Sequence, residues 1–128
     1  MQLMTVLTAA LAATLAAATP TDLNKRGCYG GGEKFGDKRG AALQYAGQWC
    51  NGAGSGGFHA GQTKHACYEH DNGNRVEFWL QRRASTGTSL GKDSCNAYLQ
   101  SQINGCDRGG SGEGDGWYYR VDPNRGSC

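Results

Sequence analysis

The chain has 128 residues, and its 13 lysines and arginines against 11 aspartates and glutamates leave a formal net charge of +2. Because basic and acidic side chains are nearly equal in number, the chain lacks the strong positive field with which proteins attract nucleic acid or anionic lipid. No nucleic-acid partner is therefore expected. Twenty-two glycines make the backbone costly to order, so covalent cross-links are expected to contribute to stability.

Residues 1–18 form an apolar run rich in alanine and leucine, with no charged side chain. The run ends in three alanines before Thr19-Pro20, which is typical of a secretory signal peptide and its cleavage point. A membrane anchor is the alternative, but the run is close to the short limit for crossing a bilayer. We therefore expect no membrane insertion of the mature form.

Residues 19–26 end in the dibasic pair Lys25-Arg26. This pair resembles a processing site for kexin-type proteases of the fungal secretory pathway; the alternative is two solvated charges in an N-terminal segment. Cleavage would remove a short propeptide and leave one secreted, extracellular domain, residues 27–128, with 11 basic and 10 acidic side chains. A chain of this length forms a single domain with a modest core.

All six cysteines lie in this predicted mature domain, and an even number in a secreted protein predicts three disulfides. They are Cys28, Cys50, Cys67, Cys95, Cys106 and Cys128. We predict that Cys106 pairs with Cys128, because only a glycine-rich turn and one strand separate them; the other pairings stay open. The chain has no C-x-x-C pair and its three histidines are scattered, so no metal site and no cofactor are predicted.

The first predicted elements are a short strand at Cys28-Tyr29 and a helix over residues 37–51. The helix places Leu43, Ala46 and Cys50 on one face, with Asp37 as its N-cap and Gly52 as its stop. A glycine-serine loop follows.

A β-hairpin is predicted next, from a strand over 63–70 and a second strand over 74–83, joined by the turn signal Asn72-Gly73. The second strand alternates strictly between apolar and other residues. Its inward side chains are Val76, Phe78 and Leu80, and its outward side chains are Glu77, Trp79 and Gln81.

The last third of the chain predicts a helix over residues 92–105, a glycine-rich turn over 107–116 and a strand over 117–121. Asp93 is expected to cap the helix and Asn104-Gly105 to end it in a left-handed conformation. The inward face of the helix is predicted to carry Cys95, Leu99, Ile103 and Cys106.

The element order strand, helix, strand, strand, helix, strand predicts an α+β sandwich, with an antiparallel sheet, two helices on one face and disulfide staples. The other face of the sheet then meets water, and an aromatic ring there offers a stacking surface for a sugar. The predicted ligand-binding residues on this face are Trp79, Glu77, Tyr118, Arg120 and His65. The alternative is that glycine-rich loops or a dimer partner cover Trp79.

Several short motifs and the spacing of the cysteines resemble a known family of small secreted fungal proteins. They are Cys28-Tyr29-Gly30, Gln48-Trp49-Cys50, the run TKHACY at 63–68, INGC at 103–106, Asp122-Pro123-Asn124 and Cys128. Together they are similar to the domain of a mushroom glycan-binding lectin, and the resemblance covers residues 27–128. It implies a helix-and-sheet sandwich, secretion and carbohydrate binding. It does not place the sugar contacts, so the predicted site rests on strand alternation.

Two alternatives belong to other classes. A killer-toxin-like sandwich with the same element order would act as an effector on a membrane or host protein target. A small secreted ribonuclease would use Glu77 as general base with His65 and Arg120 on the same face. Because no motif fixes the spacing of these three residues, no catalytic residue is assigned and a non-catalytic protein is predicted. The sequence leaves the oligomeric state open.

Overall fold

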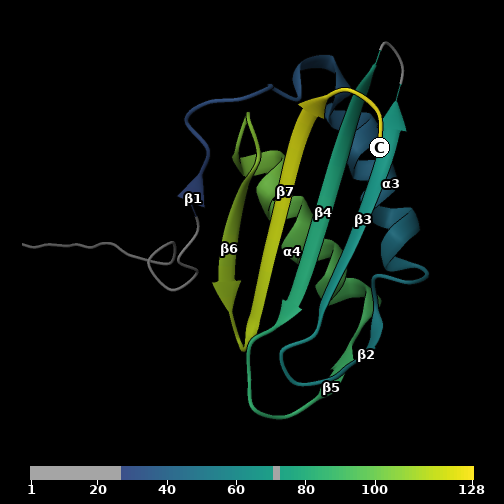
Figure 1. Ribbon diagram of the computed structural model, residues 1–128, viewed down its shortest axis with the longest axis vertical. Coiled ribbons are helices and arrows are strands. Elements are labelled where there is room, and N and C mark those ends of the chain that lie inside the picture. The colour runs from purple at the N-terminus through teal and green to yellow at the C-terminus, as the bar shows by residue number, and fades with distance from the viewer. Residues whose placement is uncertain (1–26, 71–72) are drawn as a thin grey trace, which may run out of the picture.

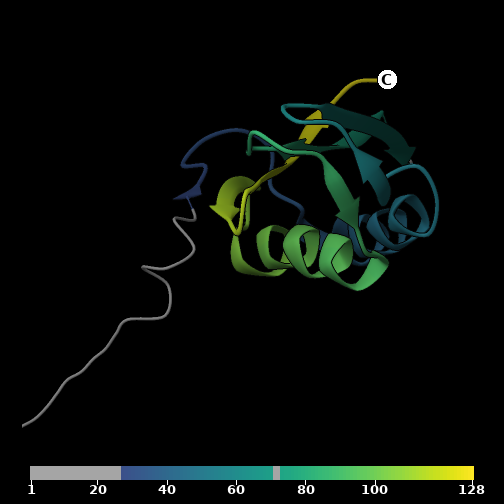
Figure 2. The same ribbon diagram turned by 90° about the horizontal axis from the view of Figure 1, so that it is seen from below.

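The computed structural model describes residues 27–70 and 73–128. The predicted signal peptide (1–18), the predicted propeptide (19–26) and Asn72 of the predicted turn lie outside these residues. The described residues form two layers, an antiparallel sheet and a pair of helices that cover one of its faces (Figures 1 and 2). The predicted fold class, a small disulfide-rich α+β domain, is confirmed.

The main sheet has five strands in the order β1-β6-β7-β4-β3, and every neighbouring pair is antiparallel. Its strands are β1 (Gly27–Cys28), β3 (Thr63–His70), β4 (Asn74–Arg82), β6 (Gly110–Gly114) and β7 (Trp117–Arg125). Two short strands, β2 (Gly56–Phe58) and β5 (Thr88–Leu90), pair with each other at one end of the molecule (Figure 1). The helical elements are η2 (Gly36–Lys38), α3 (Arg39–Cys50) and α4 (Lys92–Gly105).

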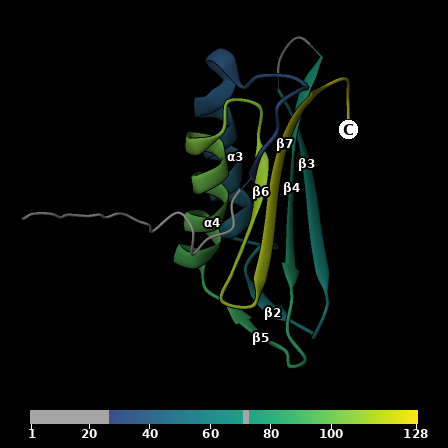
Figure 3. The ribbon, with the colours of Figure 1, turned by 90° about the vertical axis from the view of Figure 1, so that its left-hand side faces the viewer.

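The alternation predicted for β4 is confirmed. Val76, Phe78 and Leu80 are fully buried between the sheet and the helices. Because successive side chains of a strand point to opposite faces, Glu77, Trp79 and Gln81 lie on the face away from the helices. Figure 3 shows this second face free of helices along the whole sheet.

The inward face predicted for α4 is also confirmed, because Cys95, Leu99 and Ile103 are fully buried and Cys106 follows directly after the helix as a buried residue. The predicted cap and stop are wrong. Gly91 is the N-cap residue with no side-chain cap hydrogen bond, so Asp93 lies inside the first turn. Gly105 is the last helical residue, without a left-handed φ, and the chain continues extended at Cys106.

The first helix differs from its prediction at both ends. Asp37 does not cap it, because it lies in the η2 turn that precedes α3, and Lys38 occupies the N-cap position without a side-chain hydrogen bond. At the other end the last helical residue is Cys50, and Asn51 is the C-cap.

The glycine-rich segment predicted as a turn contains strand β6, and this prediction is wrong. Glycines are needed in this strand because its neighbours come very close. A Cβ atom on Gly112 would lie 2.6 Å from the Tyr119 ring, and one on Gly110 would collide with the Gly27 carbonyl. The actual turn is Asp115-Gly116, where both residues have a positive φ, as in tight β-hairpins.

The prediction of three disulfides is confirmed, but the predicted pairing of Cys106 with Cys128 is wrong. The pairs are Cys28–Cys106, Cys50–Cys95 and Cys67–Cys128. Strand β6, which the sequence did not reveal, begins just after Cys106 and pairs with β1, so that end of α4 meets Cys28.

The C-terminal residues turn the other way, toward β3. The Gly126 amide donates a hydrogen bond to the Gly73 carbonyl at 2.5 Å, and the Cys128 amide donates one to the Glu69 carboxylate at 3.2 Å. Cys128 therefore reaches Cys67, which lies on the far side of β4 from Cys106.

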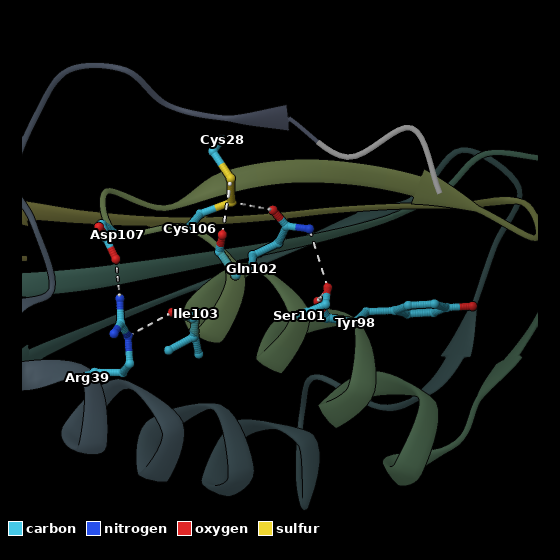
Figure 4. The surroundings of a disulfide bond; sticks show 9 residues. Cys28, Arg39, Tyr98, Ser101, Gln102, Ile103, Cys106 and Asp107 are labelled. Carbon is cyan, nitrogen blue, oxygen red and sulfur yellow. Dashed lines mark hydrogen bonds and ion pairs between the residues drawn. A yellow bond between two sulfur atoms is a disulfide. The ribbon is translucent and has the colours of Figure 1, made fainter. Parts of the chain in front are cut away.

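The Cys28–Cys106 bridge lies over a small polar network at the end of α4 (Figure 4). Gln102 is fully buried, and its Nε2 donates to Ser101 Oγ at 3.3 Å. Arg39 of α3 donates to the Ile103 carbonyl at 3.0 Å and to the Asp107 carboxylate at 2.9 Å. These bonds and the Cys50–Cys95 bridge hold the two helices together beneath the sheet.

Candidate functional site

The candidate site lies on the helix-free face of the main sheet. The strand register places His65 on β3, Trp79 on β4 and Arg120 on β7 directly opposite one another, in one row across three strands. Glu77 and Tyr118 lie on the same face, each in an adjacent row. The structure thus brings all five sequence-predicted residues together.

Trp79 is half-buried, and the groups that cover it are its neighbours in the row. The His65 ring centroid is 4.8 Å from the indole centroid, and the guanidinium carbon of Arg120 is 4.2 Å from it. These two residues come from the strands on either side of β4, so the indole stands between an imidazole and a guanidinium. A ligand on this face therefore meets the outward edge of the indole together with the polar groups of its two neighbours.

Glu77 is held by two hydrogen bonds. His65 Nε2 lies 2.9 Å from one carboxylate oxygen, and Arg75 Nε donates to the other at 3.0 Å. Burial raises the pKa of Glu77, but the hydrogen bonds and charges of Arg75 and His65 outweigh burial and leave that pKa below its usual value. A general base needs a pKa near the working pH, so this carboxylate is poorly suited to the ribonuclease role.

Arg120 is fixed by contacts on several sides. It donates to the Asp122 carboxylate at 3.2 Å, and its guanidinium carbon lies 5.7 Å from the centre of the Tyr29 ring as well as over Trp79. Its Nε is buried without a hydrogen-bond partner among the described residues.

Tyr29 is a member of this surface that the sequence interpretation did not assign to the site. Cys28-Tyr29 was predicted as a short strand, but β1 spans Gly27–Cys28 and Tyr29 follows it. Only the pairing of β1 with β6 brings Tyr29 next to Arg120. Burial raises the pKa of its hydroxyl. The only local sequence feature that could have pointed to Tyr29 as a site residue is its position directly after a cysteine.

A second contact of the same kind lies one row away. The guanidinium carbon of Arg83 is 4.4 Å from the centre of the Tyr118 ring. Arg83 also pairs with the Glu113 carboxylate at 3.2 Å and donates to Gln81 at 2.8 Å. The aromatic rings of this face are therefore each positioned by an arginine, an arrangement that favours a rigid surface.

A pocket of about 230 Å³ opens at the end of the sheet where β4 begins and β7 ends. It shares Arg75 with the site, and it is bordered by the segment 33–38, His70, Asn74, Pro123 and Asn124. A more open hollow of about 340 Å³ lies by the edge strand β1, next to Tyr29 and the Cys28–Cys106 bridge.

The described residues contain no group of three or more histidine, cysteine or acidic side chains placed to hold a metal ion. Within 27–70 and 73–128, neither helix has the length and apolar character that crossing a membrane requires.

The fold and the site define a small disulfide-rich α+β domain that presents aromatic rings and compensated charges on an open sheet face. Residues 41–128, more than half of the chain, match the family model of glycan binding domain Y3. The chain therefore belongs to the glycan binding domain Y3 family, which is a binding and not an enzymatic kind of domain. The resemblance to a glycan-binding lectin family is confirmed. No curated protein matches the chain.

Proposed function

We propose that the protein binds carbohydrate on the helix-free face of its sheet, through the row of His65, Trp79 and Arg120. The observation that carries the proposal is the geometry of this row: an indole held between two nitrogen-bearing side chains, on the open face of a domain from a glycan-binding family. Glu77 and Tyr118 extend the surface on its two sides.

The chemistry of this face fits sugar hydroxyls better than an ionic partner. Glu77 is paired with Arg75, and Arg120 with Asp122, so the face carries little uncompensated charge. Fixed donors and acceptors next to an aromatic ring can bond hydroxyl groups while the outward edge of the indole contacts the C–H groups of a sugar. Because their contacts already hold these side chains, little entropy is lost when a ligand binds.

A glycan array tests the proposal directly. Wild-type protein should bind a subset of the printed glycans, and Trp79→Ala should lose that binding. Gln100→Ala is the matched control, because Gln100 is exposed on α4 in the opposite layer. The proposal fails if Trp79→Ala keeps the wild-type binding profile while remaining folded.

We also propose that the protein is secreted and matures by cleavage after Arg26 in a fungal secretory pathway. Three disulfides support an oxidising compartment, and cleavage there would leave β1, which begins at Gly27, whole. Intact-mass analysis of the secreted protein should give a chain that starts at Gly27. Its mass should lie below that of the reduced form by six hydrogens, two for each disulfide formed. A chain that starts at Thr19 would contradict the second cleavage.

A further inference from the structure

The pocket at the end of the sheet has the composition of a small-ligand site. Phe35 is 3% exposed and Pro123 is also buried, and these two residues form its apolar part. Polar side chains border it, and Asp37 and Asn124 are among those that a ligand can reach. Ligand sites commonly combine an apolar surface with a few such converging polar groups.

The first of these two residues is Asp37, whose side chain is 94% exposed and forms an ion pair with Lys38 at 3.7 Å. The second is Asn124, whose side-chain amide makes no hydrogen bond to any residue in the described part of the chain. A carboxylate and an amide together offer acceptors and donors for neighbouring hydroxyl groups. The pocket is smaller than the roughly 300–1,000 Å³ typical of sites for drug-sized ligands, so it suits about one sugar ring.

Arg75 links the pocket to the candidate site. Arg75 borders the pocket, pairs across the sheet with Asn124, and donates a hydrogen bond to Glu77. Glu77 in turn is bonded to His65, which packs on Trp79. Arg75 and Trp79 are four residues apart on β4, about 13 Å along an extended strand. A single oligosaccharide can extend over that distance.

We propose that this pocket is a second subsite, which holds one sugar unit of an oligosaccharide whose other end lies at Trp79. The inference rests on the proposed function of the sheet face and adds to it that the ligand is a chain several sugar units long. Occupying both subsites makes the second contact intramolecular, so affinity should rise steeply once a glycan is long enough to reach the pocket.

The test compares glycan length with subsite variants of the full mature chain. The probes are monosaccharides, disaccharides and longer oligomers of chitin, N-acetyllactosamine and mixed glycans on one array. Wild-type protein should bind the longer members of a series at least about tenfold more tightly than their disaccharides. The double variant Asp37→Ala/Asn124→Ala should bind short and long members equally, and Asp37→Ala alone should show an intermediate preference. Because Asp37 is almost fully exposed, the single variant cannot lose binding through unfolding.

The outcomes separate this inference from the proposed function. If the double variant keeps the wild-type preference for length, the second subsite is wrong and the sheet-face site stands. If Trp79→Ala keeps binding and the pocket variants lose it entirely, the sheet-face site is wrong and the pocket is the main site. If wild-type protein binds no probe of any length, both proposals fail.

Discussion

Arg120 of β7 lies directly opposite Trp79 of β4, with its guanidinium carbon 4.2 Å from the centre of the indole. The same guanidinium donates to Asp122, so one side chain both positions the aromatic ring and retains its own ion pair. A cation over an aromatic face contributes about 0.5–1 kcal/mol at an exposed site. This contact orders the centre of the candidate site before any ligand arrives.

Trp79→Ala should lower the free energy of unfolding by about 1–2 kcal/mol, because the indole is half-buried and loses its contacts with Arg120 and His65. Urea denaturation monitored by circular dichroism measures this change. A fully buried tryptophan would cost about 3–5 kcal/mol. A loss of that size would show that Trp79 belongs to the core and is not a surface for a ligand.

Arg120→Lys should weaken glycan binding about tenfold while changing the free energy of unfolding by less than about 1 kcal/mol. Lysine keeps the charge but lacks the planar fork that lets Arg120 contact Trp79 and Asp122 at the same time. Titration calorimetry with an array-positive glycan gives the affinity. Arg39→Lys is the matched control, because it makes the same substitution in an arginine that also pairs with a carboxylate but lies in the helix layer. Full binding by Arg120→Lys would exclude the guanidinium from the site.

The ionised Glu77 side chain should stabilise the folded protein at a pH above about 4.5, the ordinary pKa of a glutamate. Below the lower pKa that Glu77 has in the folded protein, this stabilisation should be lost. Its pKa is lower in the folded chain, so its stabilisation is complete above the unfolded value and disappears as the pH falls through the folded one. Unfolding curves between pH 2 and pH 7 should show this loss in wild-type protein and a smaller loss in Glu77→Gln. Equal pH dependence in the two proteins would mean that the bonds to Arg75 and His65 do not stabilise the carboxylate.

Gly112→Ala should destabilise the fold by about 1–3 kcal/mol, because the added methyl group would lie 2.6 Å from the Tyr119 ring. That ring is 4% exposed and stacks on Tyr98 at 4.7 Å, so it has little room to move. Gly114→Ala in the same strand is the control, because nothing lies within 4 Å of its added methyl group. Thermal melts should separate the two variants, and equal melting temperatures would contradict the close packing of β6 under Tyr119.

Removing the Cys50–Cys95 bridge should cost more stability than removing Cys67–Cys128. The two bridges close loops over sequence separations of 45 and 61 residues, each worth about 4 kcal/mol by chain entropy, so loop length does not favour the first. Both cysteines of the first bridge are fully buried, so Cys50→Ala/Cys95→Ala also leaves a cavity, and this cavity sets the order. Cys128 is exposed, so Cys67→Ala/Cys128→Ala leaves no comparable cavity. Thermal melts give the order. Peptide mapping without reduction checks the pairs themselves, and a peptide that joins Cys106 to Cys128 would contradict this topology.

Local periodicity in the amino-acid sequence was enough to predict which side chains of a single element are buried. The alternation in residues 74–82 assigned Trp79 and Glu77 to the open face, and the spacing of Cys95, Leu99 and Ile103 assigned the buried face of α4. A strand repeats every two residues and a helix about every 3.6, so a run of side chains is enough to indicate which face is buried. The predicted site could be recognised as one face for the same reason.

Features that depend on where distant segments meet could be read only from the folded chain. The glycines of β6 have no side chains, so no alternation could reveal the strand, and without it the position of Cys106 beside Cys28 could not be inferred. Tyr29 likewise meets Arg120, and Asn124 lies opposite Arg75, only through pairing between strands far apart in the chain. Sequence periodicity describes one element at a time, whereas the order of strands in a sheet is set by the packing of all of them together.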